Sequence, residues 1–142
     1  MKIQVKKIRD VALPDYAHPK DSGMDLINAG PEVSLQPGTR ELIPSGIKVS
    51  VPENHEIQVR SRSGLAIKKG LFVLNSPGTI DAGYRGEIGV ILFNTSLKSV
   101  KIKHGQRIAQ IVLQKIEKIE WTPVQKLSSS SRDTGGFGST GS

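Results

Sequence analysis

One Gly-rich segment of the chain carries a carboxylate in a position that suits general base catalysis. The segment reads Asn75-Ser-Pro-Gly-Thr-Ile-Asp-Ala-Gly-Tyr-Arg-Gly-Glu87, and Asp81 lies at its centre. Its glycines predict a β-hairpin whose backbone bends sharply and approaches a ligand closely. Asp81 could bond the backbone of its own turn, which is the commoner role of an Asp near Gly, or stand at the rim of a pocket as a general base. The segment alone leaves both interpretations open.

Two other segments have the composition of phosphate-binding loops. Arg60-Ser-Arg-Ser-Gly-Leu-Ala66 combines guanidinium groups, hydroxyls and a Gly turn that can hold phosphate oxygens. A polar loop between two strands would have a similar composition. Gly135-Gly-Phe-Gly-Ser-Thr-Gly141 offers backbone N–H donors and hydroxyls but lacks the Gly-Lys-Ser/Thr ending of a Walker A motif. This second segment suits a mobile lid, in which Phe137 stacks on a base while the glycines wrap phosphates.

Two shorter segments place polar side chains beside Gly turns. Ser22-Gly-Met-Asp-Leu26 sets Asp25 at the start of a strand, and Gly105-Gln-Arg-Ile-Ala-Gln110 sets Arg107 and Gln110 on another. Taken singly, each segment is more typical of a structural turn than of a site.

Short runs of alternating or β-branched residues fill most of the chain, and Gly or Pro turns separate them. The clearest runs are 2–8, 47–51, 56–59, 90–93, 100–103 and 108–116. No window predicts a long amphipathic helix, and Leu65 to Lys69 suits about one helical turn. The spacing of the runs predicts an all-β fold, either a sandwich, a jelly roll or a barrel.

Length and composition limit the possible classes of protein. The 142 residues suit one domain, and the scarcity of aromatic residues (4%) favours a homo-oligomer that completes its burial through subunit contacts. The chain has no cysteine, so it has neither disulfides nor thiolate metal sites. It shows neither a secretory signal nor a run long enough to span a bilayer, which predicts a cytoplasmic protein without membrane contact.

The positive charge is spread along the chain. Lys and Arg outnumber Asp and Glu by 20 to 13, a net charge of +7, but only Lys68-Lys69 and Lys101/Lys103 form local groups. A nucleic-acid-binding protein more often carries a dense basic stripe with interleaved aromatic residues. We therefore expect most of these charges to be solvated and no stable nucleic-acid binding.

The composition changes near the C-terminus. Residues 128–142 are dominated by Ser, Gly and Thr and contain a single large apolar residue, Phe137. Such a segment cannot bury enough surface to fold by itself. The sequence therefore predicts a β domain over residues 1–126, followed by a flexible Gly-rich C-terminal arm over residues 127–142.

Together and in this order, the five segments resemble the five motifs of the trimeric dUTPase family. The matching segments are Ser22–Leu26, Arg62–Ala66, Asn75–Glu87, Gly105–Gln110 and Arg132–Gly141, and they span nearly the whole chain. The third and the fifth are the most specific. The resemblance implies a jelly-roll-like β-barrel or sandwich and a homotrimer with active sites at subunit interfaces. One subunit would give the third motif, a neighbour the first, second and fourth, and the remaining subunit its C-terminal arm.

The resemblance also implies an activity, namely hydrolysis of dUTP to dUMP and pyrophosphate by in-line attack of water on the α-phosphate. Such an enzyme limits uracil incorporation into DNA and supplies dUMP for thymidylate synthesis. Asp81 would be the catalytic base, and the cofactor would be Mg²⁺, held mainly by the triphosphate. Asp25 would lie in the outer shell of the metal, in contact through water.

The residues that would bind the substrate come from four of the motifs. Backbone groups of the third motif would read the uracil edge, Tyr84 would pack beneath the deoxyribose, and the arm would cover the nucleotide. The full set is Arg62, Ser63, Gly64, Asn75, Gly78, Thr79, Ile80, Tyr84, Gln110, Arg132, Phe137, Gly138, Ser139 and Thr140. Arg107 would brace the site.

The chain departs from the family pattern at two positions. Ser61 stands where the family usually has Pro, which predicts a less rigid loop before Arg62. Asp133 stands where the family usually has Gly, which adds a negative charge to the arm. Three rival interpretations remain: a dCTP deaminase of the same fold, a non-catalytic nucleotide-sensing or protein-binding module, and a general nucleic-acid binder.

Overall fold

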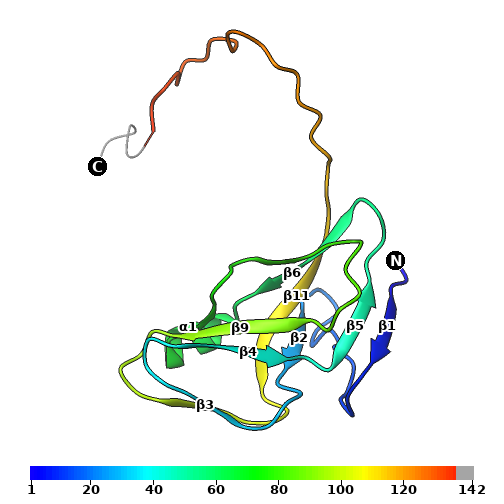
Figure 1. The fold of residues 1–142 in the computed structure, drawn as a ribbon, viewed down its shortest axis with the longest axis vertical. Helices are drawn as coiled ribbons and strands as arrows, with labels where there is room; N and C mark the ends of the chain where they lie inside the picture. Colours follow the sequence, from blue (N-terminus) through cyan, green and yellow to red (C-terminus); the bar gives the residue numbers. More distant parts are fainter. Residues whose placement is uncertain (137–142) are drawn as a thin grey trace.

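The computed structural model describes residues 1–136, which form eleven strands and one short helix (Figure 1). The elements in chain order are β1 (Gln4–Lys7), β2 (Met24–Ile27), β3 (Val33–Leu35), β4 (Arg40–Pro44), β5 (Ile47–Ser50), β6 (His55–Arg60), α1 (Ser63–Lys69), β7 (Leu71–Val73), β8 (Gly78–Ile80), β9 (Gly89–Asn94), β10 (Val100–Ile102) and β11 (Arg107–Lys115). The prediction of an all-β fold is confirmed.

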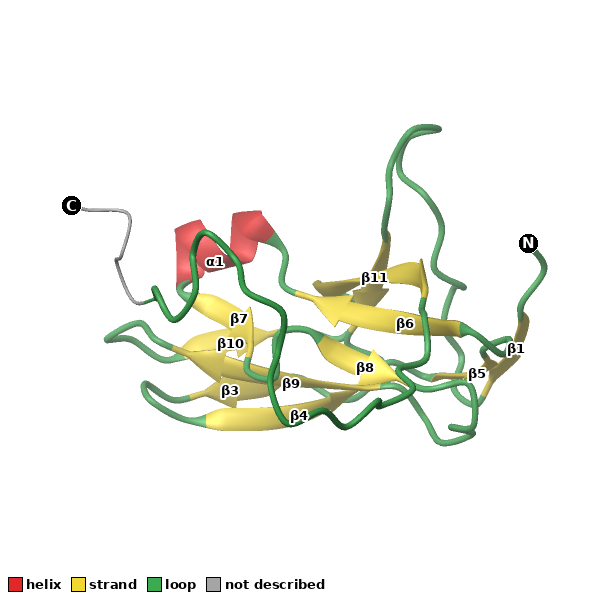
Figure 2. Ribbon diagram, turned by 90° about the horizontal axis from the view of Figure 1, so that it is seen from above, coloured by secondary structure: helices red, strands yellow, loops and turns green. Residues whose placement is uncertain are grey.

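The described strands pair into four sheets rather than closing into one continuous barrel. The largest sheet has the order β2-β11-β6-β8, and a second has the order β4-β9-β7. The pairs β1-β5 and β3-β10 complete the set, and Figure 2 shows the layers from above. All pairings are antiparallel.

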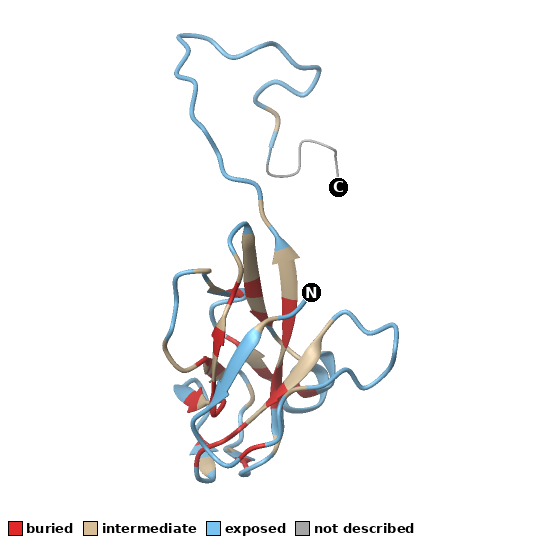
Figure 3. Cartoon of the chain, turned by 90° about the vertical axis from the view of Figure 1, so that its right-hand side faces the viewer, coloured by how far each residue is buried: buried red, intermediate tan, exposed pale blue. Residues whose placement is uncertain are grey.

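The alternation that predicted strands also decides what they bury. In β9 every second residue is buried, with Val90 and Leu92 fully inaccessible, and β6 buries Ile57 and Val59 in the same way. Because side chains alternate between the faces of a strand, each sheet turns one apolar face inward. These faces share one core, and Figure 3 marks its buried residues in red along the strands.

The single helix follows the predicted phosphate loop and is short. Arg62 is its N-cap residue, Leu65 is its one buried side chain, and Gly70 ends it with φ 64°. This left-handed conformation costs glycine nothing, and it stops the helix directly before β7. The helix extends from Ser63 to Lys69, so it begins two residues before the turn that the sequence predicted over Leu65 to Lys69.

The predicted β-hairpin over residues 75–87 is wrong. Gly78 to Ile80 form β8, but β8 pairs with β6, whereas the next strand, β9, pairs with β4 and β7 in another sheet. A turn in which Tyr84 N–H donates to the Asp81 carbonyl (3.0 Å) redirects the chain between the two sheets. The Gly pattern therefore marks a sheet-to-sheet crossing and not a ladder of paired strands.

Regular structure ends at Lys115 in the described chain. Residues 116–136 contain only bends and turns and run away from the sheets (Figures 1 and 3). Several of their apolar side chains are exposed, Trp121 most of all at 82%. The division at residue 126 stays a prediction. None of the helices within residues 1–136 has the length and apolar character that a membrane span requires.

Candidate active site

The first, second and fourth predicted segments meet at one edge of the four-stranded sheet. Asp25 on β2 is the centre of this group. Its Oδ1 lies 2.9 Å from Arg62 Nε, and its Oδ2 lies 3.2 Å from Arg107 Nη1. Arg62 Nη1 also donates to the Arg107 carbonyl at 3.3 Å. The three side chains are partly exposed, so they offer a charged surface to a ligand while holding one another in place.

Gln110 ties the fourth segment to the loop that precedes the helix. It lies opposite Asp25 in the β2–β11 register, and its Nε2 donates to the Ser61 carbonyl at 3.1 Å. Ser63 and Gly64 begin α1 directly after Arg62 and are exposed. A pocket of about 290 Å³ borders this group and is lined by Asp15, Ala17, Asp21, Ser22, Gly23, Asp25 and Gln110.

Asp81 lies directly after β8, at the rim of a second pocket of about 270 Å³. The residue is exposed, and within residues 1–136 its carboxylate makes neither a hydrogen bond nor an ion pair. The alternative in which this side chain bonds its own turn therefore does not hold. Only the backbone carbonyl of Asp81 takes part in the turn, so the carboxylate stays available to a ligand.

Tyr84 forms one wall of the Asp81 pocket, and the hydroxyl end of its ring is held in place. Its hydroxyl donates to the Glu87 carbonyl at 2.9 Å, and its ring lies against Gly86. A Cβ on Gly86 would lie 2.9 Å from Tyr84 Cε2 and closer still to the end of the ring. Glycine at position 86 is therefore required for the observed position of the Tyr84 ring.

Among the described strands, β8 has one backbone edge without a partner, and this edge lies beside the same pocket. It is the last strand of its sheet, so alternate N–H and C=O groups face away from β6. Asn75 lies next to this strand, and Gly78 is packed so closely that a Cβ would lie 3.2 Å from Asn75 Nδ2 and 3.3 Å from Val59 Cβ. Thr79 and Ile80 line the pocket itself.

The two groups of predicted site residues do not meet within one chain. Asp25 and Asp81 belong to β2 and to the end of β8, which are the opposite edges of the sheet β2-β11-β6-β8. Neighbouring strands are about 4.8 Å apart, so these edges are separated by roughly 14 Å. The structure thus groups Asp25, Arg62 and Gln110 in one place, and Asp81 with Tyr84 in another.

The C-terminal arm contacts neither group in the part of the chain that is described. Arg132 is exposed, and its Nε donates to the Gly135 carbonyl at 2.8 Å. Asp133 has φ 45°, a left-handed conformation. Phe137, Gly138, Ser139 and Thr140 lie outside the described residues.

Asp25 does not offer a vacant ligand to a metal ion. Both of its oxygens are engaged by guanidinium groups, and residues 1–136 contain no cluster of three His, Cys, Asp or Glu side chains able to hold a metal. Mg²⁺ prefers several oxygen ligands and keeps bound waters. Residues 1–136 therefore supply no complete ligand set for Mg²⁺, which fits an ion whose other ligands come from a bound phosphate group.

Two positioning residues are absent from the predicted set. Glu87 Oε1 accepts hydrogen bonds from Gly46 N–H (2.8 Å) and from Arg9 Nε (3.2 Å), which anchors the segment that carries Tyr84. Ser61 accepts through its carbonyl from Gln110 and through its hydroxyl from Val73 N–H (2.9 Å). The only signal for Ser61 in the sequence was that it stands where the family usually has Pro. The hydrogen bonds of Ser61 argue against the less rigid loop that this difference predicted.

Comparison with known proteins gives one consistent result. The dUTPase family model matches residues 9–141. The deoxyuridine 5'-triphosphate nucleotidohydrolase of Clostridium tetani is 51% identical over 141 residues, which cover 99% of this chain and 96% of that protein.

Solved structures agree with the sequence comparisons. The Staphylococcus bacteriophage 80alpha dUTPase with dUpNHpp aligns with a TM-score of 0.91 and 30% identity over 99% of both chains. A mutant dUTPase from phage phi11 of S. aureus, described for its coordination of a structural Mg(II) ion, aligns with a TM-score of 0.83 and 26% identity. That alignment covers 91% of this chain and 100% of the phage protein. The chain therefore belongs to the dUTPase family.

Proposed function

We propose that this protein hydrolyses dUTP to dUMP and pyrophosphate at active sites that lie between the subunits of a homotrimer. Family membership over nearly the full chain supports the reaction. The structural observation that carries it is the Asp81 carboxylate, exposed and unengaged at the rim of the pocket that Tyr84 and β8 line. A purely structural Asp in this turn would bond its backbone.

Uracil would be selected by the free edge of β8. The base presents acceptor, donor and acceptor groups along one edge, and the outward N–H and C=O groups of residues 78–80 can match them, together with the Asn75 side chain. Cytosine reverses part of this pattern and would leave a buried polar group unpaired, at a cost of about 1–3 kcal/mol. The close packing of Gly78 supports a rigid edge that does not adapt to the wrong base.

Tyr84 would select the sugar. Its ring is held between Gly86 and the hydrogen bond to the Glu87 carbonyl, so it forms a fixed wall of the pocket. A deoxyribose can pack on such a wall, whereas the 2′-hydroxyl of a ribose would collide with it. The same ring would exclude water from one side of the nucleotide.

Asp81 would act as the general base. Its carboxylate would accept a proton from a water molecule that attacks the α-phosphorus in line with the leaving pyrophosphate. The α-phosphorus–oxygen bond to pyrophosphate breaks as the new bond to the water oxygen forms. The absence of an intramolecular partner for this carboxylate within residues 1–136 leaves both oxygens available to orient the water.

The phosphates would be held by the group around Asp25. Arg62, Ser63, Gly64 and Gln110 supply a guanidinium, a hydroxyl, backbone N–H groups and an amide for this purpose. Arg107 would brace the site through its ion pair with Asp25. Mg²⁺, when bound to the triphosphate, would neutralise charge on the phosphate oxygens, and Asp25 would contact its waters.

The separation of the two groups supports the homotrimer. Roughly 14 Å of sheet lies between Asp25 and Asp81 in one chain, more than the length that a phosphate and an attacking water can bridge. A neighbouring subunit that places its Asp25, Arg62 and Gln110 beside the Asp81 pocket would complete the site. Arg132 and the arm segment with Phe137, Gly138, Ser139 and Thr140 would then come from the remaining subunit.

The deciding experiment measures pyrophosphate release from dUTP, dTTP, dCTP and UTP with Mg²⁺. We expect release from dUTP alone, and a loss of several orders of magnitude in Asp81→Asn, which removes the base without changing the size of the side chain. Asp10→Asn, at an exposed carboxylate after β1, is the matched control and should keep full activity. Ammonia released from dCTP, or equal rates for Asp81→Asn and the wild type, would contradict the proposal.

A further inference from the structure

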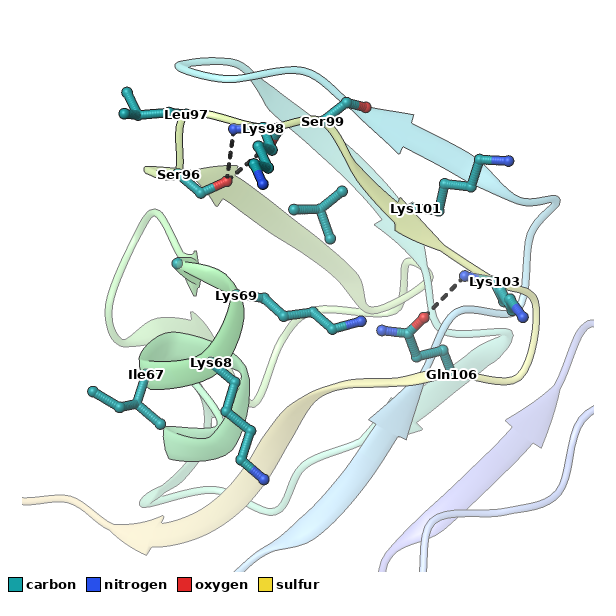
Figure 4. A pocket seen from close by; sticks show the side chains of 12 residues that line it. Ile67, Lys68, Lys69, Ser96, Leu97, Lys98, Ser99, Lys101, Lys103 and Gln106 are labelled. Carbon is teal, nitrogen blue, oxygen red and sulfur yellow. Dashed lines mark hydrogen bonds between the residues drawn. The ribbon is translucent and has the colours of Figure 1, made fainter.

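Five lysine side chains from separate segments line a pocket of about 750 Å³ away from the predicted site residues (Figure 4). They are Lys68 and Lys69 at the end of α1, Lys98 in the β9–β10 turn, Lys101 in β10 and Lys103 after it. No Asp or Glu is among the lining residues, all of which lie in the described chain. We name this feature the lysine pocket.

The fold holds the two main walls of the lysine pocket together. The Gly70 carbonyl, at the end of α1, accepts hydrogen bonds from Thr95 N–H (2.9 Å) and from Thr95 Oγ1 (2.8 Å). A Cβ on Gly70 would lie 2.8 Å from Thr95 Oγ1, so the close approach requires glycine. The contact sets Lys68 and Lys69 beside the turn that carries Lys98.

A buried asparagine fixes the turn that carries Lys98. Asn94 is fully buried, and its Nδ2 donates to the carbonyls of Leu35 and Lys98, both at 2.9 Å. Its Oδ1 accepts from Ser96 N–H (2.9 Å) and from Ser96 Oγ (2.7 Å). The backbone of this wall is therefore preorganised, although the lysine ammonium groups themselves are exposed.

The opposite wall is fixed in a similar way. Gln106 Oε1 accepts from Lys103 N–H at 3.0 Å, which closes the turn between β10 and β11. Lys101 makes the one ion pair that any of the five lysines forms within the described residues, 3.7 Å from exposed Glu32. Within residues 1–136 the positive charge of the pocket is thus almost entirely uncompensated.

Ordinary solvation explains only part of this grouping. Lysines in the last turn of a helix are favoured by the helix dipole, which accounts for Lys68 and Lys69. Alternation along β10 puts Lys101 on the exposed face of the strand, but it explains neither Lys98 nor the meeting of these segments with the end of α1. Like charges held together repel one another unless an anion binds, so such a pocket attracts multivalent anions.

We propose that the lysine pocket binds a compact phosphate chain of the pyrophosphate or tripolyphosphate class. Ammonium groups act as point charges toward phosphate oxygens and need no planar geometry. The volume suits a small ligand. The lining includes no aromatic side chain on which a nucleic-acid base could stack, which favours a phosphate chain over a single strand.

Isothermal titration with tripolyphosphate tests this proposal, with the dUTP site first saturated by dUpNHpp. We expect one tripolyphosphate to bind per chain, with an affinity that falls as ionic strength rises. The triple variant Lys69→Gln, Lys98→Gln, Lys103→Gln should weaken the binding by about tenfold or more. The matched control, Lys2→Gln, Lys7→Gln, Lys20→Gln, removes the same charge at exposed positions outside the pocket and should stay within about twofold of the wild type.

The alternatives give different results in the same experiment. Equal weakening by both triple variants would show a general effect of net charge and would overturn the proposal, as would a wild type that binds no tripolyphosphate. An oligonucleotide that binds more tightly than tripolyphosphate, and only to the wild type and the control, would assign the pocket to nucleic acid instead. Because the readout is binding, the result does not depend on whether the protein hydrolyses dUTP.

Discussion

The Ser61 hydroxyl oxygen accepts a hydrogen bond from the Val73 backbone N–H at 2.9 Å. Ser61 precedes the proposed phosphate-binding residues, and Val73 ends β7, two residues before the segment that carries Asp81. The Val73 carbonyl in turn accepts a hydrogen bond from the Ser76 hydroxyl. One residue of β7 therefore connects the loop before Arg62 with the segment that contains Asp81, and in the proposed trimer these two serve different active sites.

Ser61→Ala removes the acceptor of the Val73 N–H, which faces away from the partner strand β9. A buried donor without a partner costs about 1–3 kcal/mol, so we expect the melting temperature to fall by several degrees. Hydrogen exchange at the Val73 amide should become faster. Ser61→Thr keeps the hydroxyl and is the matched control. Unchanged exchange in the alanine variant would show that the hydroxyl does not protect this amide.

Gly86→Ala should weaken the selection of deoxyribose over ribose. The added Cβ would lie 2.9 Å from Tyr84 Cε2 and closer to the ring end, so the ring must move from its place. We expect the ratio of kcat/KM for dUTP to that for UTP to fall by about tenfold, equivalent to about 1.4 kcal/mol. At Gly83 a Cβ would meet nothing within 4 Å, which makes Gly83→Ala the control. The same loss in both variants would remove Tyr84 from this role.

Asp133→Gly should improve closure of the C-terminal arm. Asp133 has φ 45°, a left-handed conformation that glycine adopts most easily and aspartate at a somewhat higher cost. The change also removes a negative charge near the proposed triphosphate site. We expect KM for dUTP to fall by about fivefold with kcat unchanged.

Asp133→Asn separates the two causes, because it removes the charge while asparagine and aspartate adopt the left-handed conformation with similar ease. Equal effects of the two substitutions would assign the change in KM to charge. A higher KM in Asp133→Gly would contradict the role of this residue in the arm.

The strands that the sequence predicted best are those with strict alternation. The runs 47–51, 56–59 and 90–93 became β5, β6 and β9, because alternation of apolar and polar side chains records which face of a strand is buried. β7 and β8 have only three residues each, too few to show a period. The wrong hairpin has a related cause, because local Gly spacing marks a turn without stating which strand pairs with which.

The site residues also differ in whether a local sequence pattern identifies them. The ordered motifs identified Asp25, Arg62 and Gln110, and the pairing of β11 with both β2 and β6 brings them together. Ser61 and Glu87 act through hydrogen bonds to residues 12 and 41 positions away, which no local pattern contains. No local sequence pattern encodes the contacts between subunits. The complete site could therefore be inferred only from the resemblance to the family.

Mixing inactive subunits tests the proposed sharing of active sites directly. Asp81→Asn and Arg62→Ala should each be inactive alone, because every site of the homotrimer would lack one group. In mixed trimers, a site that takes Asp81 from one variant and Arg62 from the other would be complete. Random mixing of equal amounts makes about one site in four complete, so about a quarter of wild-type activity should return.

The measurement follows dUTP hydrolysis after the two variants are unfolded and refolded together, with each variant refolded alone as the control. Light scattering should give the mixed species a mass of about 46 kDa, three times the chain mass of 15.4 kDa. If the site lay within one chain, mixing would restore nothing, because no chain carries both Asp81 and Arg62. Because two strands separate β2 from β8 in one sheet, we expect recovery.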